Sequence, residues 1–302
     1  MYSRTFSTTI CLFWLMSMTW LVSQKVLPSL RIGQPPNYHT ILEAQKQDPV
    51  VGWRLAFNNH ELGWALSETK QQENGMTEIS SRVYFNHLPL AELTSIMSRV
   101  FNRILENNMP KLALDARSSL LIDPLGKLVR FDSTLRANEI LDPIRIQGVV
   151  EGSQMEISID SKDYSAKKEF YLPQNAIVGD ALSPQSQLPN LCEGQTWTAP
   201  SFSPFRSASA PMEIQIAKVE GRELISWDDQ IVDTWLVVYR NDPGEGFRNS
   251  QNPRDKLWVA DDGRVLKQSS VIFDSTMTFT RMTEDEARKL ALEMKNAEMN
   301  EE

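Results

Sequence analysis

Between Val50 and Arg281 the sequence is dominated by short segments in which apolar and polar residues alternate. In one of them Met155, Ile157 and Ile159 alternate with polar residues. A period of two places successive side chains on opposite faces, which is typical of a β-strand with one buried face. Turn signals such as Asp123–Gly126 and Glu220-Gly221 separate the segments. The pattern predicts a mainly β protein built on one large curved antiparallel sheet, or open half-barrel, of roughly ten or more strands.

One segment of this region has the period of a helix instead. In residues 90–106 the apolar side chains recur at helical spacing; they are Leu93, Ile96, Met97, Val100, Phe101, Ile104 and Leu105. Asn107, Asn108 and Pro110 end the segment. We expect the sheet to pack on this one amphipathic helix. A partner-binding or membrane-facing stripe is the alternative interpretation.

The N-terminus carries an apolar segment of nearly membrane-spanning length. Residues 8–23 contain no charged residue, Gly or Pro. A helix of this length is about 24 Å long, against about 30 Å of bilayer hydrocarbon, and extension to Leu27 brings it to spanning length. Leu21 and Leu27 occupy positions where signal cleavage requires a small residue. We therefore predict an uncleaved transmembrane signal anchor at 8–27 with residues 1–7 in the cytoplasm; a cleaved signal peptide and a buried helix are the alternatives.

The rest of the chain is expected on the far side of that membrane. Residues 28–49 contain Pro35-Pro36 and few apolar residues, which predicts a stalk. Residues 50–282 form a single antiparallel β ectodomain in this interpretation. The capping box Thr283–Glu286 then begins a short C-terminal helix and an acidic tail over 283–302. This segment contains seven acidic and three basic residues.

Composition narrows the classes of partner and chemistry. The net charge is −8, which does not favour a nucleic-acid partner. Two cysteines and three histidines leave little material for a disulfide scaffold or a metal site. The sequence contains no phosphate-binding loop, dinucleotide-binding glycine run or hydrolase nucleophile motif. We expect no cofactor and no enzymatic activity, with an envelope enzyme such as a hydrolase that uses an unrecognised site as the alternative.

Large apolar side chains on the predicted strands suggest a ligand surface. The candidates are Trp53, Trp64, Trp235, Trp258, Met277 and Phe279. On the concave face of a curved sheet they would form an apolar hollow for an acyl chain or for the hydrophobic segment of a protein partner. The alternative is that a tightly packed core uses all of them.

Several short motifs carry a family resemblance. They include Gly63-Trp64, the Asp123–Gly126 hairpin, Leu191-x-x-Gly194-Gln195-Thr196-Trp197 and Asp262-Gly263. In these the chain resembles the β domains that precede transglutaminase-like modules in exported, membrane-anchored bacterial proteins. It is also similar in outline to the half-barrels of periplasmic lipoprotein carriers. The sequence contains no transglutaminase core with its Cys, His and Asp, so no catalytic residue is carried over.

This resemblance implies a function and a location. It implies a non-catalytic binding module for a lipid or for an envelope or transport protein. Taken with the apolar N-terminal segment, it predicts a location in a bacterial cytoplasmic membrane through a single N-terminal span, with the C-terminal domain in the periplasm.

The anchor leads to a first testable prediction. Membranes washed with alkaline carbonate should retain the full-length protein, because an uncleaved apolar helix holds it in the bilayer. The measurement is fractionation followed by mass determination of the retained chain. Recovery of a soluble form that begins near Gln24 or Leu30 would contradict the prediction.

Overall fold

The structure is a computed structural model that describes residues 4–21, 36, 38–47, 50–58, 60–88, 112–137, 142–162, 164–171, 177–178, 184–202, 212–241, 253–272 and 275–301. The helices in these residues are α1 (Arg4–Leu21), α3 (Tyr38–Gln47) and α6 (Glu284–Glu301). The strands are β1 (Val50–Phe57), β2 (His60–Gln71), β3 (Thr77–Leu88), β4 (Leu112–Ile122), β5 (Leu128–Ala137), β6 (Ile144–Glu151), β7 (Gln154–Ser161), β8 (Tyr164–Tyr171), β9 (Ile177–Val178), β10 (Thr196–Phe202), β11 (Met212–Trp227), β12 (Gln230–Asn241), β13 (Asp255–Val259), β14 (Val265–Ile272) and β15 (Ser275–Arg281).

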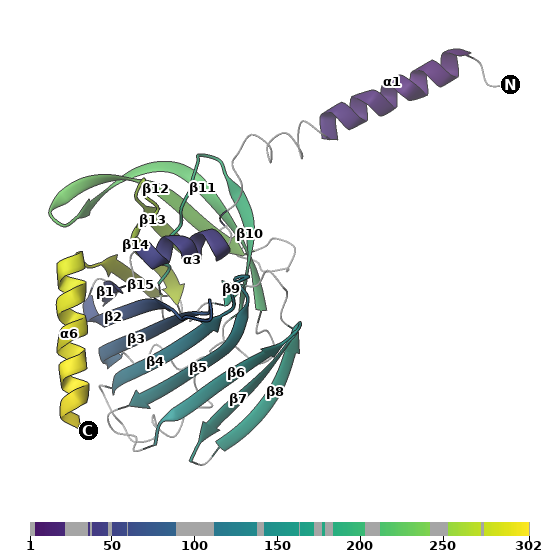
Figure 1. Cartoon of the computed structure of the whole chain (residues 1–302). Helices are drawn as coiled ribbons and strands as arrows, with labels where there is room; N and C mark the ends of the chain where they lie inside the picture. Colours follow the sequence, from purple (N-terminus) through teal and green to yellow (C-terminus); the bar gives the residue numbers. More distant parts are fainter. Residues whose placement is uncertain are drawn as a thin grey trace.

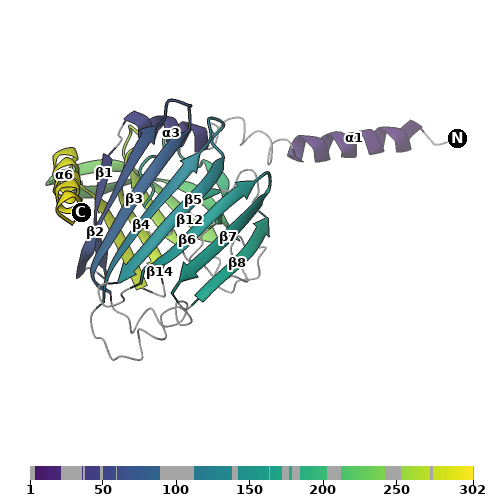
Figure 2. The same ribbon diagram turned by 60° about the horizontal axis from the view of Figure 1, so that its bottom comes forward.

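All of these strands belong to one sheet. Its order is β8-β7-β6-β5-β4-β3-β2-β1-β15-β14-β13-β12-β11-β10-β9, with fifteen strands in the described residues. Every neighbouring pair is antiparallel except β9 and β10. The sheet curls, so that a wall made of β1–β8 faces a second wall containing β12 and β14 (Figures 1 and 2). The prediction of a mainly β protein with a large antiparallel open sheet is confirmed.

The two walls are joined where the first and last strands pair. On β1, Trp53 lies opposite Arg281 of β15, and Leu55 lies opposite Phe279. In the other direction the same β1 residue, Leu55, lies opposite Gly63 of β2. A Cβ atom at Gly63 would lie 1.9 Å from the carbonyl oxygen of Tyr84, so only glycine fits at this close approach between strands.

The hairpin of β11 and β12 is longer than the sequence indicated. The expected turn at Glu220-Gly221 is wrong, because Gly221 (φ 141°) instead sits at a bulge within β11. The chain reverses at Asp228-Asp229, whose φ values of 49° and 56° are those of a hairpin turn of the I′ type. A bulge bends a strand and increases its twist, and this one lies within β11, ahead of the hairpin tip.

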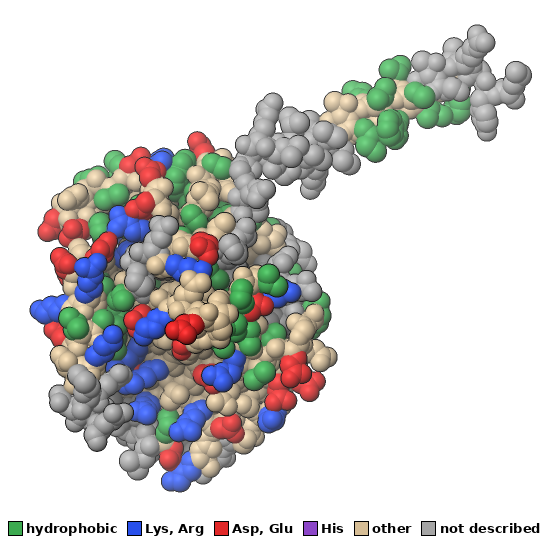
Figure 3. Space-filling model, viewed as in Figure 1, with side chains coloured by type: hydrophobic (Ala, Val, Ile, Leu, Met, Phe, Trp, Pro, Cys, Tyr) green, Lys and Arg blue, Asp and Glu red, His purple; other side chains and the backbone are tan. Residues whose placement is uncertain are grey.

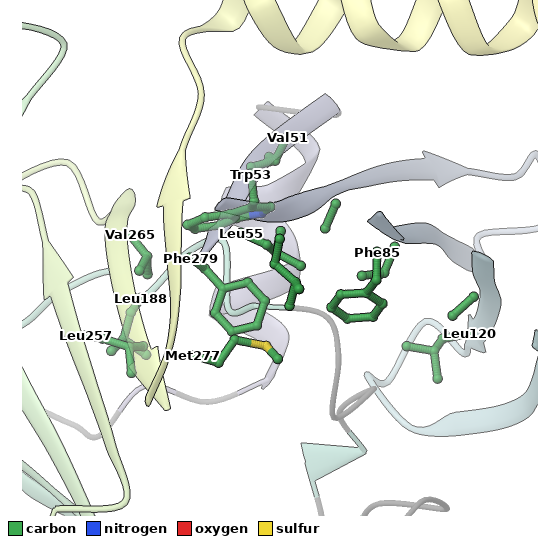
Figure 4. Packing of buried hydrophobic residues seen from close by; sticks show 14 of the residues in the cluster. Val51, Trp53, Leu55, Phe85, Leu120, Leu188, Leu257, Val265, Met277 and Phe279 are labelled. Carbon is green, nitrogen blue, oxygen red and sulfur yellow. The ribbon is translucent and has the colours of Figure 1, made fainter. Parts of the chain in front are cut away.

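The core lies on the concave face of the curled sheet. A continuous cluster of buried apolar side chains runs from Met155 on β7, through β1 and β15, to Ala217 on β11. Trp53, Leu55, Phe85, Met277 and Phe279 point into this cluster from β1, β3 and β15 (Figure 4).

Two segments outside the regular strands complete the core. Helix α3 buries Ile41 and Leu42 and contacts β2. Residues 38–47 therefore belong to the folded body, and the predicted stalk over 28–49 does not extend to Val50. The second segment is 184–195, in which Leu188 packs beside Leu257 and Val265 (Figure 4). Backbone hydrogen bonds between Leu188 and Gly263 and between Val265 and Ser186 hold it against the start of β14.

The C-terminal helix begins as the sequence predicts. The Thr283 backbone N–H donates to Glu286 Oε2 at 3.0 Å, and the Glu286 N–H donates to Thr283 Oγ1 at 3.4 Å. Helix α6 lies on β1 (Figure 1), where Ala287 is buried over Gly52. Arg54 on β1 forms an ion pair with Glu286. Thus the cap also ties the helix to the sheet.

Two predicted helices, the anchor at 8–27 and the amphipathic helix at 90–106, are not established by the structure. Residues 4–21 form helix α1, whose described side chains are exposed. Among the described residues, no helix combines the length and the apolar character needed to cross a bilayer. The anchor at 8–27, whose last six residues lie outside the described part, stays a prediction. The amphipathic helix at 90–106 also lies outside the described residues.

The cap generates a second prediction. The hydrogen bond from the Thr283 N–H, with help from the nearby Arg54 guanidinium, holds the pKa of Glu286 below its usual value, although burial acts in the opposite direction. A lowered pKa contributes stability that is complete above the unfolded-state value of about 4.3 and is lost as pH falls through the folded-state value. Glu286→Gln should therefore reduce the free energy of unfolding at pH 7 by up to about 1 kcal/mol, a small effect because the carboxylate is exposed.

Denaturant unfolding of both proteins at several pH values measures this difference. It should be greatest near neutrality and should close in acid. Glu293→Gln, in the exposed middle of α6, removes a carboxylate of the same helix without touching the cap and is the matched control. An equal difference at all pH values would contradict the role assigned to the carboxylate.

Candidate functional site

The concave face is the candidate functional site, because four of the six predicted ligand-surface residues meet there. Trp53, Met277 and Phe279 are each at most 3% exposed, and they belong to the same apolar cluster. Trp235 on β12 is partly buried and packs against this cluster. Its ring also lies 3.9 Å from the guanidinium carbon of Arg222.

Trp64 lies on the opposite, convex face. Its neighbours across the strands are Arg54 and Tyr84. The Trp64 and Tyr84 rings stack with centroids 5.7 Å apart, and the Arg82 guanidinium lies 5.8 Å from the Trp64 centroid. Arg82 in turn donates to both carboxylate oxygens of Asp115 at 2.8 and 2.7 Å. This residue therefore takes part in an aromatic and ionic surface cluster and not in the concave face.

Trp258 also faces outward, into a second and smaller apolar cluster. It packs with Ile225 and Leu266. The β11–β12 hairpin tip reaches this place, since Trp227 Nε1 donates to the Arg281 carbonyl at 2.8 Å. Trp258 thus belongs to the packing of the hairpin against the convex side of β13 and β14.

Both ends of the concave face keep apolar side chains that are only partly buried. Ile144, Ile159 and Phe170 lie on β6–β8 at one end, and Trp197 and Tyr239 lie on β10 and β12 at the other. In the described residues the two end strands, β8 and β9, do not pair with each other. The sheet therefore stays open, and the partly exposed apolar side chains lie on the strands toward its two ends.

Tyr239 adds a neutral polar group to this lining. Burial raises the pKa of its phenol well above the usual value, and the nearby Asp255 carboxylate contributes in the same direction. The Trp197 and Tyr239 rings meet edge to face with centroids 6.1 Å apart. Tyr239 is thus an uncharged phenol at physiological pH.

A row of serine hydroxyls crosses the concave face of the first wall. Ser67, Ser81, Ser118 and Ser133 lie opposite one another on β2, β3, β4 and β5. Ser81 Oγ and Ser118 Oγ are 2.6 Å apart. Ser133 is buried, whereas the other three are partly exposed. The sequence analysis missed this row, because its only signal was a serine at an inward position of four separate strands.

A second polar group lies beneath α3. Gln45 Nε2 donates to Ser186 Oγ at 2.9 Å, and Arg281 Nη1 donates to the Ser186 carbonyl at 2.9 Å. The Arg281 guanidinium also lies 5.8 Å from the centroid of the Trp53 ring. Sequence reasoning missed this cluster because it assigned Gln45 to a stalk and Ser186 to a loop.

The described residues offer little for metal or nucleophilic chemistry. No three His, Cys, Asp or Glu side chains among them are grouped as metal ligands would be. Charges of both signs are interspersed over the face of the body shown in Figure 3. The arrangement is therefore suited to binding an apolar group beside neutral hydrogen-bonding side chains.

Comparison with known proteins finds similar solved structures only, and these have low sequence identity. The sequence matches no protein-family model and no curated protein. The structure is similar to a β-barrel-like protein of the domain of unknown function DUF1849 from Brucella abortus, with 10% identity, a TM-score of 0.46 and coverage of 77% of this chain and 95% of that one. A DUF1089 family protein from Pseudomonas aeruginosa shows 14% identity and a TM-score of 0.33 over 67% of this chain and 87% of its own.

Packing at the site generates a third prediction. Phe279→Ala should reduce the free energy of unfolding by about 3–5 kcal/mol, because it opens a cavity in the cluster where β1 meets β15. Leu224→Ala is the matched control at a position that is 66% exposed near the β11–β12 tip, and its effect should stay within about 0.5 kcal/mol. Denaturant unfolding monitored by circular dichroism measures both. A Phe279→Ala protein as stable as the control would show that the concave cluster is not the core.

Proposed function

We propose that this chain is a single-pass bacterial membrane protein whose exported β domain binds an apolar, lipid-like ligand on its concave face without catalysing a reaction. The observation that carries the proposal is the set of partly exposed apolar side chains near both ends of the open sheet, from Phe170 on β8 to Trp197 on β10. Apolar side chains on an inner face that stay partly in contact with water gain free energy when a ligand covers them.

The magnitude of this gain is sufficient for binding. Each methylene group removed from water contributes about 0.8 kcal/mol, so ten methylene groups of an acyl chain contribute about 8 kcal/mol. Association costs at least several kcal/mol in lost freedom. When the association cost is at the low end of its range of about 4–15 kcal/mol, the surplus corresponds to weak binding, which suits a carrier that must also release its ligand.

The edge of the sheet favours a ligand over a protein that adds a strand. Edge strand β8 carries Lys167, Lys168 and Glu169 in succession. Charged side chains on an edge disfavour pairing with another chain. The Glu156 carboxylate, which accepts a hydrogen bond from Lys167, raises the pKa of this lysine and keeps it charged. An envelope protein that docks by other means remains the second candidate partner.

The predicted anchor fits the same function. A span at 8–27 would hold the domain beside the bilayer, in the periplasm, where single lipid chains are available. The ligand would then have a short distance to travel between membrane and protein.

Two neighbouring residues of β8 provide the fourth prediction. Phe170 faces the concave side and is partly buried, whereas Tyr171 is 69% exposed on the other side. Phe170→Ser should weaken the binding of an environment-sensitive anilinonaphthalene sulfonate dye by about fivefold or more, because it removes apolar contact area. Tyr171→Ser should leave the affinity unchanged.

Fluorescence titration measures both variants, and palmitate should displace the dye from the unaltered protein. Thermal unfolding confirms that each variant is folded. If the folded protein binds neither dye nor palmitate, lipid binding is excluded and the protein-partner function replaces it.

A further inference from the structure

We propose that the polar cluster beneath α3 binds the oxygen-bearing head group of the ligand, and that this ligand is a single-chain alcohol or fatty acid. The cluster consists of Gln45 on α3, Trp53 on β1, Ser186 on the 184–195 segment and Arg281 on β15. This inference rests on the proposed function, because it assigns one end of the same apolar ligand.

Two polar atoms of the cluster are buried without a hydrogen-bond partner. They are the Trp53 indole N–H, on a side chain with no exposed surface, and the Gln45 side-chain oxygen. Leaving such a group unpaired costs about 1–3 kcal/mol. Buried polar groups are normally paired, and Gln45 and Trp53 are linked through Ser186 and Arg281, so the unpaired donor and the unpaired acceptor of this cluster indicate a group that they are built to hold.

The partners of these residues define what that group must be. Gln45 uses its nitrogen on Ser186 Oγ at 2.9 Å, and whichever way the amide is turned one of its two polar atoms has no partner. The indole N–H can only donate, so it requires an acceptor. With the Gln45 oxygen unpaired, an oxygen that accepts from Trp53 and donates to Gln45 satisfies both, as a hydroxyl or a protonated carboxyl group does. With the amide turned, an oxygen that accepts from both residues is required, and a hydroxyl or a carboxylate supplies it.

The surroundings of the cluster orient the rest of the ligand. Trp53 is packed with Leu55 and Phe279 in the apolar cluster (Figure 4), and Ile41 of α3 is buried in the same cluster. A head group at Trp53 therefore places its alkyl chain against apolar side chains of the concave face. Because Trp53 has no exposed surface, the head group must displace α3 or the 184–195 segment to enter.

A matched control residue lies next to the cluster. Gln187 is also buried and its side-chain oxygen also has no hydrogen-bond partner. It is not among the four residues of the cluster; it follows Ser186 and forms an isolated β-bridge with Arg264. Gln187→Met therefore makes the same chemical change as Gln45→Met at a place that the head group does not reach.

The experiment titrates the full-length chain, held in solution by an amphipathic polymer, with dodecanol, dodecanoic acid and dodecane. The first readout is the Trp53 indole N–H resonance of isotope-labelled protein, assigned by its absence in Trp53→Phe. It should move with dodecanol or dodecanoic acid and stay in place with dodecane. Comparison of the first two probes distinguishes a hydroxyl from a carboxyl head group.

The second readout is affinity and does not depend on the Trp53 variant. Gln45→Met should lower the affinity for the oxygen-bearing probe by about tenfold, as expected for one lost hydrogen bond. The same substitution should leave the affinity for dodecane unchanged, and Gln187→Met should leave the affinities for all three probes unchanged.

The outcomes separate the two proposals. If the probes bind but the indole resonance is unmoved and Gln45→Met has no selective effect, lipid binding stands and the head-group site is wrong; a structural water then pairs these atoms. If no probe binds, the proposed function fails and this inference fails with it.

Discussion

The pairing of β1 with β15 is the interaction on which the architecture depends. One series of strands runs from β1 to β8 and the other from β15 back to β9, and they are joined only by this pair in the described sheet. Trp53 and Leu55 from one series meet Arg281 and Phe279 from the other. The pair lies at the centre of the apolar cluster and also carries α6, whose residue Ala287 covers Gly52. Contacts between residues so distant in sequence carry a high entropic cost of loop closure, so the core must compensate for that cost here.

Much of the fold follows from local pattern, and the parts that do not have identifiable causes. Alternation identified most strands, and Thr283–Glu286 located the start of α6, because each signal needs only neighbouring residues. Alternation did not determine which face of β13 is concave, since Leu257, Trp258 and Val259 are all apolar and buried. The cross-strand register settles it, with Leu257 opposite Val237 of the core and Trp258 opposite Leu236 of the outer cluster. Trp64 was assigned to the wrong face for a similar reason, as it adjoins the inward Gly63 and Ala65.

The residues of the polar cluster beneath α3 were beyond any local pattern. Gln45 and Ser186 belong to segments without strand or helix periodicity of useful length, and their significance arises only when α3, β1, β15 and the 184–195 segment come together. Arg281 illustrates the same point. It follows an alternating strand as an ordinary charged terminus would, but the structure buries it against Trp53 and the Ser186 carbonyl. A single sequence shows which residue types are present, but it does not show which of them lie close together in space and so form a site.

The open sheet and the polar groups on its inner face fit a single physical account. A closed barrel would leave no edge and could bury every inward apolar side chain, whereas this sheet ends in the charged strand β8 and the two-residue strand β9. Its inner face is crossed by the row from Ser67 to Ser133 and has Gln45 and Trp53 at the α3 end. A purely apolar ligand would leave the unpaired atoms of Gln45 and Trp53 without partners, at a cost similar to that of several lost methylene contacts. An amphiphilic ligand avoids that cost, because its oxygen meets the polar groups while its chain covers the apolar side chains near the open ends. The combination of an unclosed apolar face with buried, unpaired polar atoms therefore favours a ligand that is itself part polar and part apolar.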